Sequence, residues 1–174
     1  MEIKVAELLK KGVGATANFE VEESIEDIDD TGNSYDVRGE VELLRTDKGV
    51  LARGLVQTVV SCTCSRCLAP FDAHLIYRIE EEYIQTVDMV TGAHLDIPEE
   101  ALFTIDEEQK IDLNEALRQS AVLALPMKPL CRPECAGICP ACGADLNRER
   151  CSCRPVAVDS RWAKLEKLLS IHSD

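Results

Sequence analysis

Six cysteines lie within the 23 residues from Cys131 to Cys153, a spacing that is typical of zinc binding. In the run Cys139-Pro-Ala-Cys142-Gly143, the two residues between the cysteines let both sulfurs turn to one side. Gly143 permits the tight turn in which backbone N–H groups face the sulfurs and stabilise thiolate charge. The segment therefore predicts at least one structural zinc site, with an iron–sulfur cluster or a thiol redox role as the alternatives.

A structural zinc site takes four ligands, so six cysteines are more than one site needs and too few for two sites. An earlier CxxC pair, Cys64 and Cys67, raises the number of candidate ligands to eight and leaves Cys62 over. In the first possible partition, one site consists of Cys64, Cys67, Cys131 and Cys135, and the other of Cys139, Cys142, Cys151 and Cys153. In the second partition, a single local site consists of Cys131, Cys135, Cys139 and Cys142, and the remaining cysteines stay thiols.

We favour the first partition, because four ligands spread over twelve residues would leave little backbone between the pairs. A metal that joins residue 64 to residue 131 would also close a long loop and constrain the unfolded chain. Such a site would pin the cysteine segment onto the preceding strands. The alternative for Cys64 and Cys67 is a pair of metal-free thiols at a strand end, and Cys62 is interpreted as a small apolar side chain.

The chain of 174 residues carries 32 acidic and 19 basic residues, a formal net charge of −13. This balance argues against a protein that coats nucleic acid or binds a membrane surface. Residues 128–167 are mildly basic, with eight basic and five acidic side chains, but two four-thiolate zinc sites would bring the whole chain to about −17. Arg148, Arg150 and Arg154 could make a local RNA contact, although we expect them to face solvent.

Nine cysteines and an N-terminus without a basic or apolar leader region indicate a reducing compartment. In such a compartment, cysteine clusters bind metal more often than they form disulfides. The most apolar stretch, residues 121–127, is too short to span a bilayer. We therefore expect a soluble, cytoplasmic protein.

The first half of the chain has the alternating pattern of β-strands. Residues 35–46 and 50–64 predict a hairpin with a turn at Asp47–Gly49, where we expect Gly49 to supply a positive φ. Residues 71–85 predict a further strand with Leu75, Tyr77 and Ile79 on one side. Residues 15–23 predict a short strand that leads into an acidic loop, because residues 20–30 hold seven carboxylates.

Helices are predicted after these strands. Asp112 and Glu115 resemble a capping box, and Pro126 ends the helix that they begin. The apolar face of this helix consists of Leu113, Ala116, Leu117, Ser120, Ala121 and Ala124. A final helix capped by Asp159 would carry Trp162, Leu165, Leu168 and Leu169. We therefore expect an α+β fold, in which a mainly antiparallel β body (residues 1–110) precedes a helical, cysteine-rich and zinc-binding C-terminal region (residues 111–174) that packs on it.

Two separated motifs carry a specific resemblance. The first is Cys64-Ser-Arg-Cys67-Leu followed by Pro70-Phe71, and the second runs from Ala124-Leu-Pro-Met-Lys-Pro-Leu-Cys131 through Cys135-Ala-Gly-Ile-Cys139 and Asn147 to Asp159-Ser-Arg161. From about residue 35 onward, the chain resembles the large ribosomal RNA subunit accumulation protein family of bacteria and plastids. Some forms of that family have the early CxxC and the cysteines near 131–135 without the later four, which would suit the first partition.

The resemblance implies a role in accumulation of large-subunit ribosomal RNA, and hence in ribosome assembly, without a known enzymatic activity. The genes of family members often lie beside that of a large-subunit ribosomal protein, which suggests a ribosomal protein or the precursor RNA as partner. The first functional hypothesis is thus a non-catalytic, acidic, zinc-binding assembly factor that meets a basic partner.

The alternative hypothesis is a thiol redox enzyme that uses Cys64 and Cys67. A redox pair usually needs a thiolate activated at a helix N-terminus, whereas this pair lies between two predicted strands. The three histidines, His74, His94 and His172, form no catalytic pattern with a nucleophile or carboxylate. We therefore predict that the protein is not an enzyme.

Overall fold

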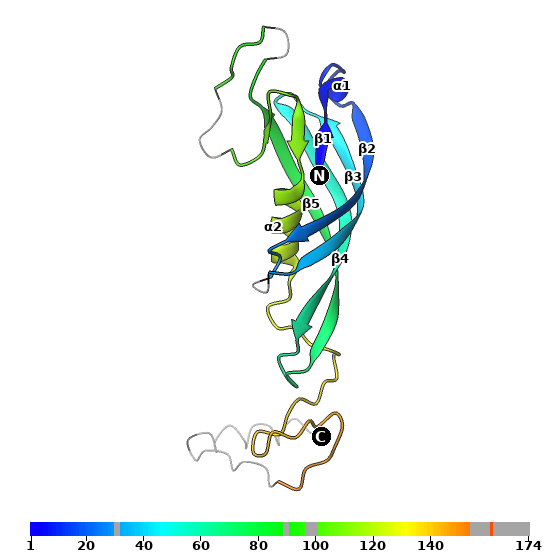
Figure 1. Cartoon of the computed structure of the whole chain (residues 1–174), viewed down its shortest axis with the longest axis vertical. Helices are drawn as coiled ribbons and strands as arrows, with labels where there is room; N and C mark the ends of the chain where they lie inside the picture. Colours follow the sequence, from blue (N-terminus) through cyan, green and yellow to red (C-terminus); the bar gives the residue numbers. More distant parts are fainter. Residues whose placement is uncertain (30–31, 89–90, 97–100, 154–160, 162–174) are drawn as a thin grey trace. The chain divides into compact units, whose positions relative to one another are not determined.

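The computed structural model describes residues 1–29, 32–88, 91–96, 101–153 and 161, and its chain forms two compact units (Figure 1). The sheet unit consists of residues 1–62 and 70–129, and the cysteine unit consists of residues 63–69 and the described part of 130–174. The helical segment after residue 111, which the sequence analysis grouped with the cysteines, thus lies in the sheet unit. No described helix is long and apolar enough to cross a membrane.

Five strands form the main sheet in the order β2-β3-β4-β5-β6. Their bounds are Thr16–Glu26 for β2, Ser34–Arg45 for β3, Gly49–Thr63 for β4, Pro70–Gln85 for β5 and Thr104–Ile105 for β6. The predicted hairpin is confirmed, since β3 and β4 pair antiparallel from Val37↔Thr58 to Arg45↔Val50. The strand predicted after it is confirmed as β5, in which Leu75, Tyr77 and Ile79 are buried.

The prediction of an antiparallel body needs one correction, because the sheet is mixed. The short strand β6 pairs parallel with the end of β5, with Ile84 beside Thr104 and Gln85 beside Ile105. The described chain also has a second, two-stranded antiparallel sheet made of β1 (Glu2–Lys4) and β7 (Lys110–Asp112), and a short helix α1 (Ala6–Leu9). These pairings join segments far apart in the sequence, so no pattern among neighbouring residues could predict them.

The acidic loop predicted within residues 20–30 is wrong for its first part, because β2 continues to Glu26. Val21 and Ile25 are 2% and 4% exposed, while Glu20 and Glu22 face solvent. Alternation along a strand sends successive side chains to opposite faces, so most of the charge stays in water and its repulsion is screened. The prediction of a loop therefore overestimated how strongly repulsion between the carboxylates destabilises this strand.

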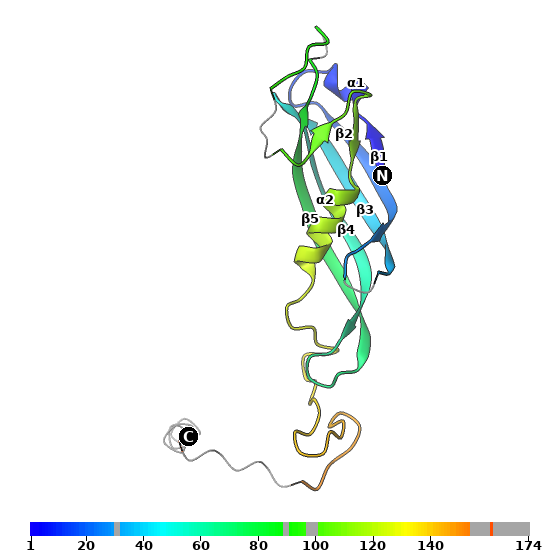
Figure 2. The same cartoon turned by 60° about the vertical axis from the view of Figure 1, so that its left-hand side comes forward.

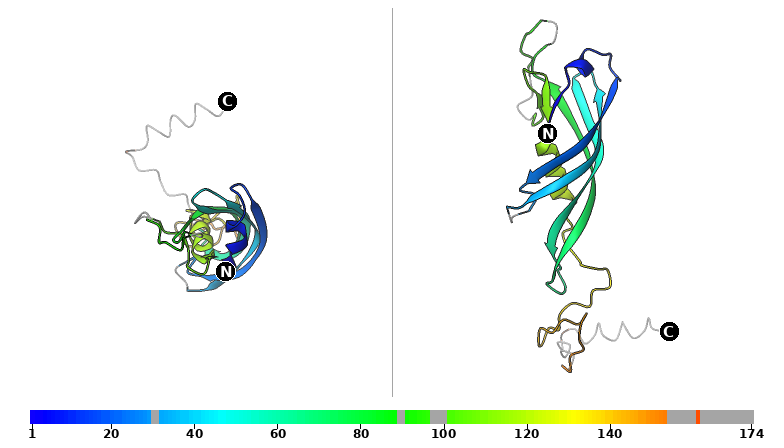
Figure 3. Two further views of the ribbon diagram at one scale, coloured as in Figure 1. Left: turned by 90° about the horizontal axis from the view of Figure 1, so that it is seen from above. Right: turned by 45° about the vertical axis from the view of Figure 1, so that its right-hand side comes forward.

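Helix α2 (Asn114–Ala124) begins and ends where the sequence predicts. The carboxylate of Asp112 accepts the backbone N–H of Asn114 at 3.0 Å, whereas Glu115 bonds Arg118 and Gln119 and not the backbone. The buried side of the helix packs against β5 and β2, and the sheet curves around it (Figures 2 and 3). The final helix predicted after Asp159 lies outside the described residues.

Three glycines in the sheet are required for close approach of backbones. Gly49 does not have a positive φ, so that prediction is wrong; a Cβ there would overlap the carbonyl of Tyr83 instead. A Cβ at Gly39 or Gly54 would overlap the backbone of the neighbouring strand, with Val41 Cα 2.9 Å from the Cβ position of Gly54. Glycines that lie against a neighbouring backbone in this way mark a tight bend, which fits the curvature of the sheet around α2.

Candidate metal centres

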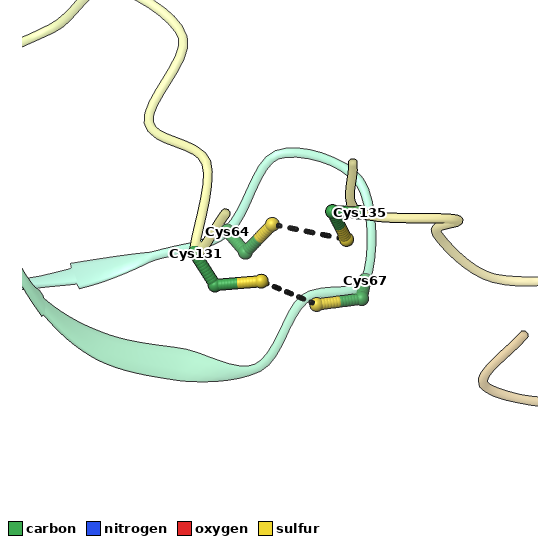
Figure 4. A group of neighbouring side chains, drawn as sticks. All are labelled: Cys64, Cys67, Cys131 and Cys135. Atoms are coloured by element: carbon green, nitrogen blue, oxygen red, sulfur yellow. Dashed lines mark hydrogen bonds between the residues drawn. The ribbon is translucent and has the colours of Figure 1, made fainter. Parts of the chain in front are cut away.

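The first cysteine cluster, here called site 1, consists of Cys64, Cys67, Cys131 and Cys135. The first two lie in the loop that joins β4 to β5, and the other two lie on the segment that follows α2. Cys64 Sγ lies 3.8 Å from Cys135 Sγ, and Cys67 Sγ lies 3.8 Å from Cys131 Sγ. All four sulfurs lie within 4.8 Å of one another and point into one space (Figure 4).

The second cluster, site 2, consists of Cys139, Cys142, Cys151 and Cys153, whose sulfurs also lie within 4.8 Å of one another. Gly143 has a φ of +75° and donates its N–H to the carbonyl of Cys139 at 2.9 Å, which forms the predicted tight turn. The structure therefore groups the eight cysteines as in the first partition. Their role as metal ligands stays a prediction.

Cys62 lies outside both clusters. Its side chain is half-buried against the apolar core of the sheet unit, and burial raises the pKa of its thiol. Both features agree with the interpretation of Cys62 as a small apolar side chain. The same residue therefore offers a matched control for experiments on the clustered cysteines.

Arg66 organises the backbone around site 1. Its carbonyl accepts the N–H of Ile138 at 3.2 Å, and its guanidinium donates to the carbonyl of Cys135 at 2.9 Å. Gly137 has a φ of +78° and places its Cα against the same carbonyl of Arg66, where a Cβ would lie at 3.1 Å. Arg66, inside the first CxxC, thus contacts the segment from Cys135 to Ile138 of the second motif.

Asn147 is a residue whose role the sequence analysis did not assign. Its amide nitrogen lies 3.5 Å from Cys135 Sγ and donates to Asp145 at 2.7 Å. Its amide oxygen accepts from the backbone N–H of Ala136 at 2.9 Å and from Arg132 at 2.7 Å. Because Asn147 lies between the two halves of site 2 in the sequence, it ties that loop to a sulfur of site 1. The only sequence indication was its place in the second motif.

Hydrogen bonds and crowding shift the pKa values of several thiols in the two clusters. Backbone N–H groups of Cys131 and Cys67 lower the pKa of Cys64 to about 6, and those of Cys142 and Ala141 lower that of Cys139 to about 6. The sulfurs of Cys142 and Cys139 raise the pKa of Cys153 to about 12. Four thiolates cannot share so small a space unless a cation compensates their charge.

The sulfur spacing fits a tetrahedral metal ion. A metal–sulfur distance of about 2.3 Å, as in zinc–thiolate sites, places tetrahedral sulfurs about 3.8 Å apart. The two sulfur pairs of site 1 have this separation. The donor set, four thiolates without an open position for water or substrate, is typical of a structural site and not of a catalytic one.

The other predicted functional groups take no part in these clusters. Arg148 is 83% exposed and pairs with Asp145 at 3.4 Å, so it faces solvent as expected. Arg150 is exposed, while Arg154 and His172 lie outside the described residues. His74 and His94 are exposed and lie in the sheet unit. Cys64 and Cys67 lie in a loop between two strands, so this pair lacks the helix N-terminus that commonly activates a redox thiol.

Comparison with known proteins found one family. A family model described as large ribosomal RNA subunit accumulation protein YceD matches residues 52–169. A protein of Mycobacterium tuberculosis named as uncharacterized is 35% identical over 127 residues, which are 73% of this chain and 59% of the relative. A chloroplastic protein of Arabidopsis thaliana, named large ribosomal RNA subunit accumulation protein YCED homolog 1, is 23% identical over 82% of this chain and 51% of its own length.

A protein of Zea mays with the same name as the Arabidopsis one is 28% identical over 59% of this chain and 43% of its own length. The chain thus spans between two fifths and three fifths of the length of these relatives. No solved structure matches the chain.

Proposed function

Because the chain belongs to the large ribosomal RNA subunit accumulation protein family, we propose that it is a non-catalytic, zinc-binding factor that supports accumulation of large-subunit ribosomal RNA. The observation that carries the zinc proposal is the pair of four-sulfur clusters, in which the sulfurs of site 1 have the separation of tetrahedral zinc ligands. Cys64, Cys67, Cys131 and Cys135 would hold one ion, and Cys139, Cys142, Cys151 and Cys153 would hold the other.

The make-up of the cysteine unit supports zinc as a structural element. Its described part buries Cys64, Cys135 and Cys139, which are 0%, 2% and 5% exposed, and no Leu, Ile, Val or aromatic side chain. A segment of this size without an apolar core needs a metal or crosslinks to hold one conformation. Bound zinc would supply that stability and would leave no site open for catalysis.

The proposed role places the protein where ribosomes are assembled, in the cytoplasm as predicted from the sequence. Its partner would be a ribosomal protein or the precursor of large-subunit RNA. The excess of 32 acidic over 19 basic residues supports a basic protein as the partner more than RNA, because the phosphate backbone is repelled by the same charge.

Metal analysis tests the zinc part of the proposal. The purified chain should contain close to two zinc ions, and the double substitution Cys64→Ser with Cys67→Ser should remove one of them. The matched control, Cys62→Ser, should leave two, because this thiol lies outside both clusters. A content near one zinc in the unsubstituted chain, or iron in place of zinc, would contradict the assignment.

Depletion of the protein in its host tests the ribosomal role. Sucrose-gradient profiles and RNA blots should show less large-subunit RNA and fewer large subunits. A gene with the Cys64→Ser and Cys67→Ser substitutions should restore these less well than a gene with Cys62→Ser. A normal ribosome profile after depletion would overturn the proposed role.

A further inference from the structure

The outer face of the main sheet, on the side away from the buried residues, carries a strongly one-sided charge. On β2 and β3 the outward positions hold one arginine, Arg38, and six carboxylates: Glu20, Glu22, Glu26, Asp36, Glu40 and Glu42. Glu22 pairs with Arg38 at 3.5 Å, and Glu42 pairs with Arg53 of β4 at 2.7 Å. Among the described residues, no cation lies within ion-pair distance of Glu20 or Glu40.

These two carboxylates are directly opposite each other in the strand register, Glu20 on β2 and Glu40 on β3. Like charges in this arrangement destabilise a sheet, so the pair costs the isolated protein some stability. The next residue in the same row is Leu55 on β4, which lies opposite Glu40 and is 59% exposed. A row of two facing carboxylates and an exposed leucine is unfavourable in water and becomes favourable when a cation with an apolar stem lies across it.

Apolar side chains continue from this row along the same face. Val59 on β4 and Ile76 on β5 are 44% and 67% exposed. They line a surface depression of about 610 Å³, together with Asp36, Arg38 and His74. Glu40, Leu55 and Glu80 line a second depression of about 640 Å³, together with Arg78 and with Arg53, which pairs with Glu42. The face therefore offers two hollows lined by apolar and charged side chains, and Glu40 in the second hollow has no ion-pair partner among the described residues.

We propose that this outer face is the docking surface for a lysine- or arginine-rich segment of a protein partner. The cations of the segment meet Glu20 and Glu40, and its apolar side chains meet Leu55, Val59 and Ile76. The charge selects the partner, because carboxylates attract basic protein segments and repel the phosphates of RNA. The inference rests on the proposed function for the origin of the partner, which we take to be a protein of the large ribosomal subunit.

Photo-crosslinking tests the location of the surface. The zinc-loaded full chain carries p-benzoylphenylalanine in place of Leu55, and the probe is the set of large-subunit ribosomal proteins, purified free of RNA. The control places the same group at Leu123, which is 85% exposed on α2. We expect crosslinks from position 55 into a lysine- or arginine-rich segment of an individual protein and none of comparable yield from position 123. Equal yields from both positions, or crosslinks from position 55 to added ribosomal RNA alone, would overturn the proposal.

Charge reversal tests the chemistry with a readout that separates binding from folding. Glu40→Lys should weaken binding of the crosslinked protein by about tenfold or more, and the loss should shrink at high salt. The control Glu107→Lys changes the net charge equally at an exposed position in the turn between β6 and β7. It should change the affinity less than about twofold.

Thermal unfolding distinguishes this result from simple damage to the fold. Because Glu40→Lys puts opposite charges where Glu20 and Glu40 now face each other, its midpoint should equal or exceed that of the unsubstituted chain. Weaker binding together with undiminished stability supports the docking surface. Equal loss of affinity in both variants, or none in Glu40→Lys, refutes it. A normal ribosome profile after depletion would instead refute the proposed function, so the two failures are distinguishable.

Discussion

In the sheet unit Val37, Val41 and Leu43 have no exposed surface, whereas the buried side chains in the described part of the cysteine unit are those of three cysteines. The sheet unit and the cysteine unit also differ in charge. The 26 carboxylates before residue 128 all belong to the sheet unit, while arginines such as Arg66, Arg132 and Arg148 are prominent in the cysteine unit. One chain thus combines a unit stabilised by apolar burial with a unit in which we expect crosslinks between sulfurs and a cation to supply the stability.

Removal of metal should distinguish the two units most clearly. Structural zinc contributes on the order of 10–16 kcal/mol in small domains, so a strong chelator should unfold the cysteine unit and leave the sheet unit folded. Hydrogen exchange measures the stability of the cysteine unit and of the sheet unit in one experiment. The amide of Cys139, which donates to the carbonyl of Ala144 at 2.8 Å, should lose its protection, while amides of β3 and β4 keep theirs. Loss of protection in both units together would show that the two are not independent.

A substitution at Gly54 should damage the sheet unit alone. The new Cβ of Gly54→Ala would overlap the carbonyl of Glu40 and lie 2.9 Å from Val41 Cα, and these backbone atoms cannot move without distorting the strand. We expect the free energy of unfolding by urea to fall by about 3 kcal/mol or more, with the zinc content unchanged. Gly12→Ala is the control, because its Cβ would meet no atom within 4 Å.

A substitution at Asn147 should affect only the cysteine unit. Asn147→Ala removes the amide that lies 3.5 Å from Cys135 Sγ and the oxygen that accepts from Ala136. Loss of a group that orients a metal ligand typically weakens metal binding about 10- to 100-fold. Competition with a chromogenic chelator should show one of the two zinc ions released earlier. As a control, Asn18→Ala on β2 should leave the release of both zinc ions unchanged. Unchanged release from Asn147→Ala would show that this amide does not support site 1.

Two tyrosines of β5 give the smallest and most closely matched test. Tyr83 donates its hydroxyl to the carbonyl of Asp112 at 2.9 Å, so Tyr83→Phe should cost the sheet unit about 1 kcal/mol. The buried hydroxyl of Tyr77 has no hydrogen-bond partner among the described residues, and burial raises its pKa to about 12. Tyr77→Phe should therefore leave the free energy of unfolding unchanged or raise it. A loss as large as that of Tyr83→Phe would contradict this assignment.

The elements that depend on neighbours along the chain could be predicted from the sequence. The β3–β4 hairpin, the inward face of β5 and the bounds of α2 followed from alternation, from the turn at residues 47–49 and from the apolar spacing that Pro126 ends. The spacing of the cysteines also identified which residues could hold metal. In each case the period of the strand or helix places residues a few positions apart on one side, so the pattern is readable without knowledge of the fold.

Features that depend on contacts between distant segments could be found only in the tertiary structure. It grouped Cys64 and Cys67 with Cys131 and Cys135, where spacing had left two partitions open. It extended β2 through the acidic run and paired β6 parallel with β5. The number of carboxylates and the number of cysteines can be counted in the sequence, but these counts do not predict which way each side chain points. Only the fold shows which carboxylates turn to water and which sulfurs turn toward one another.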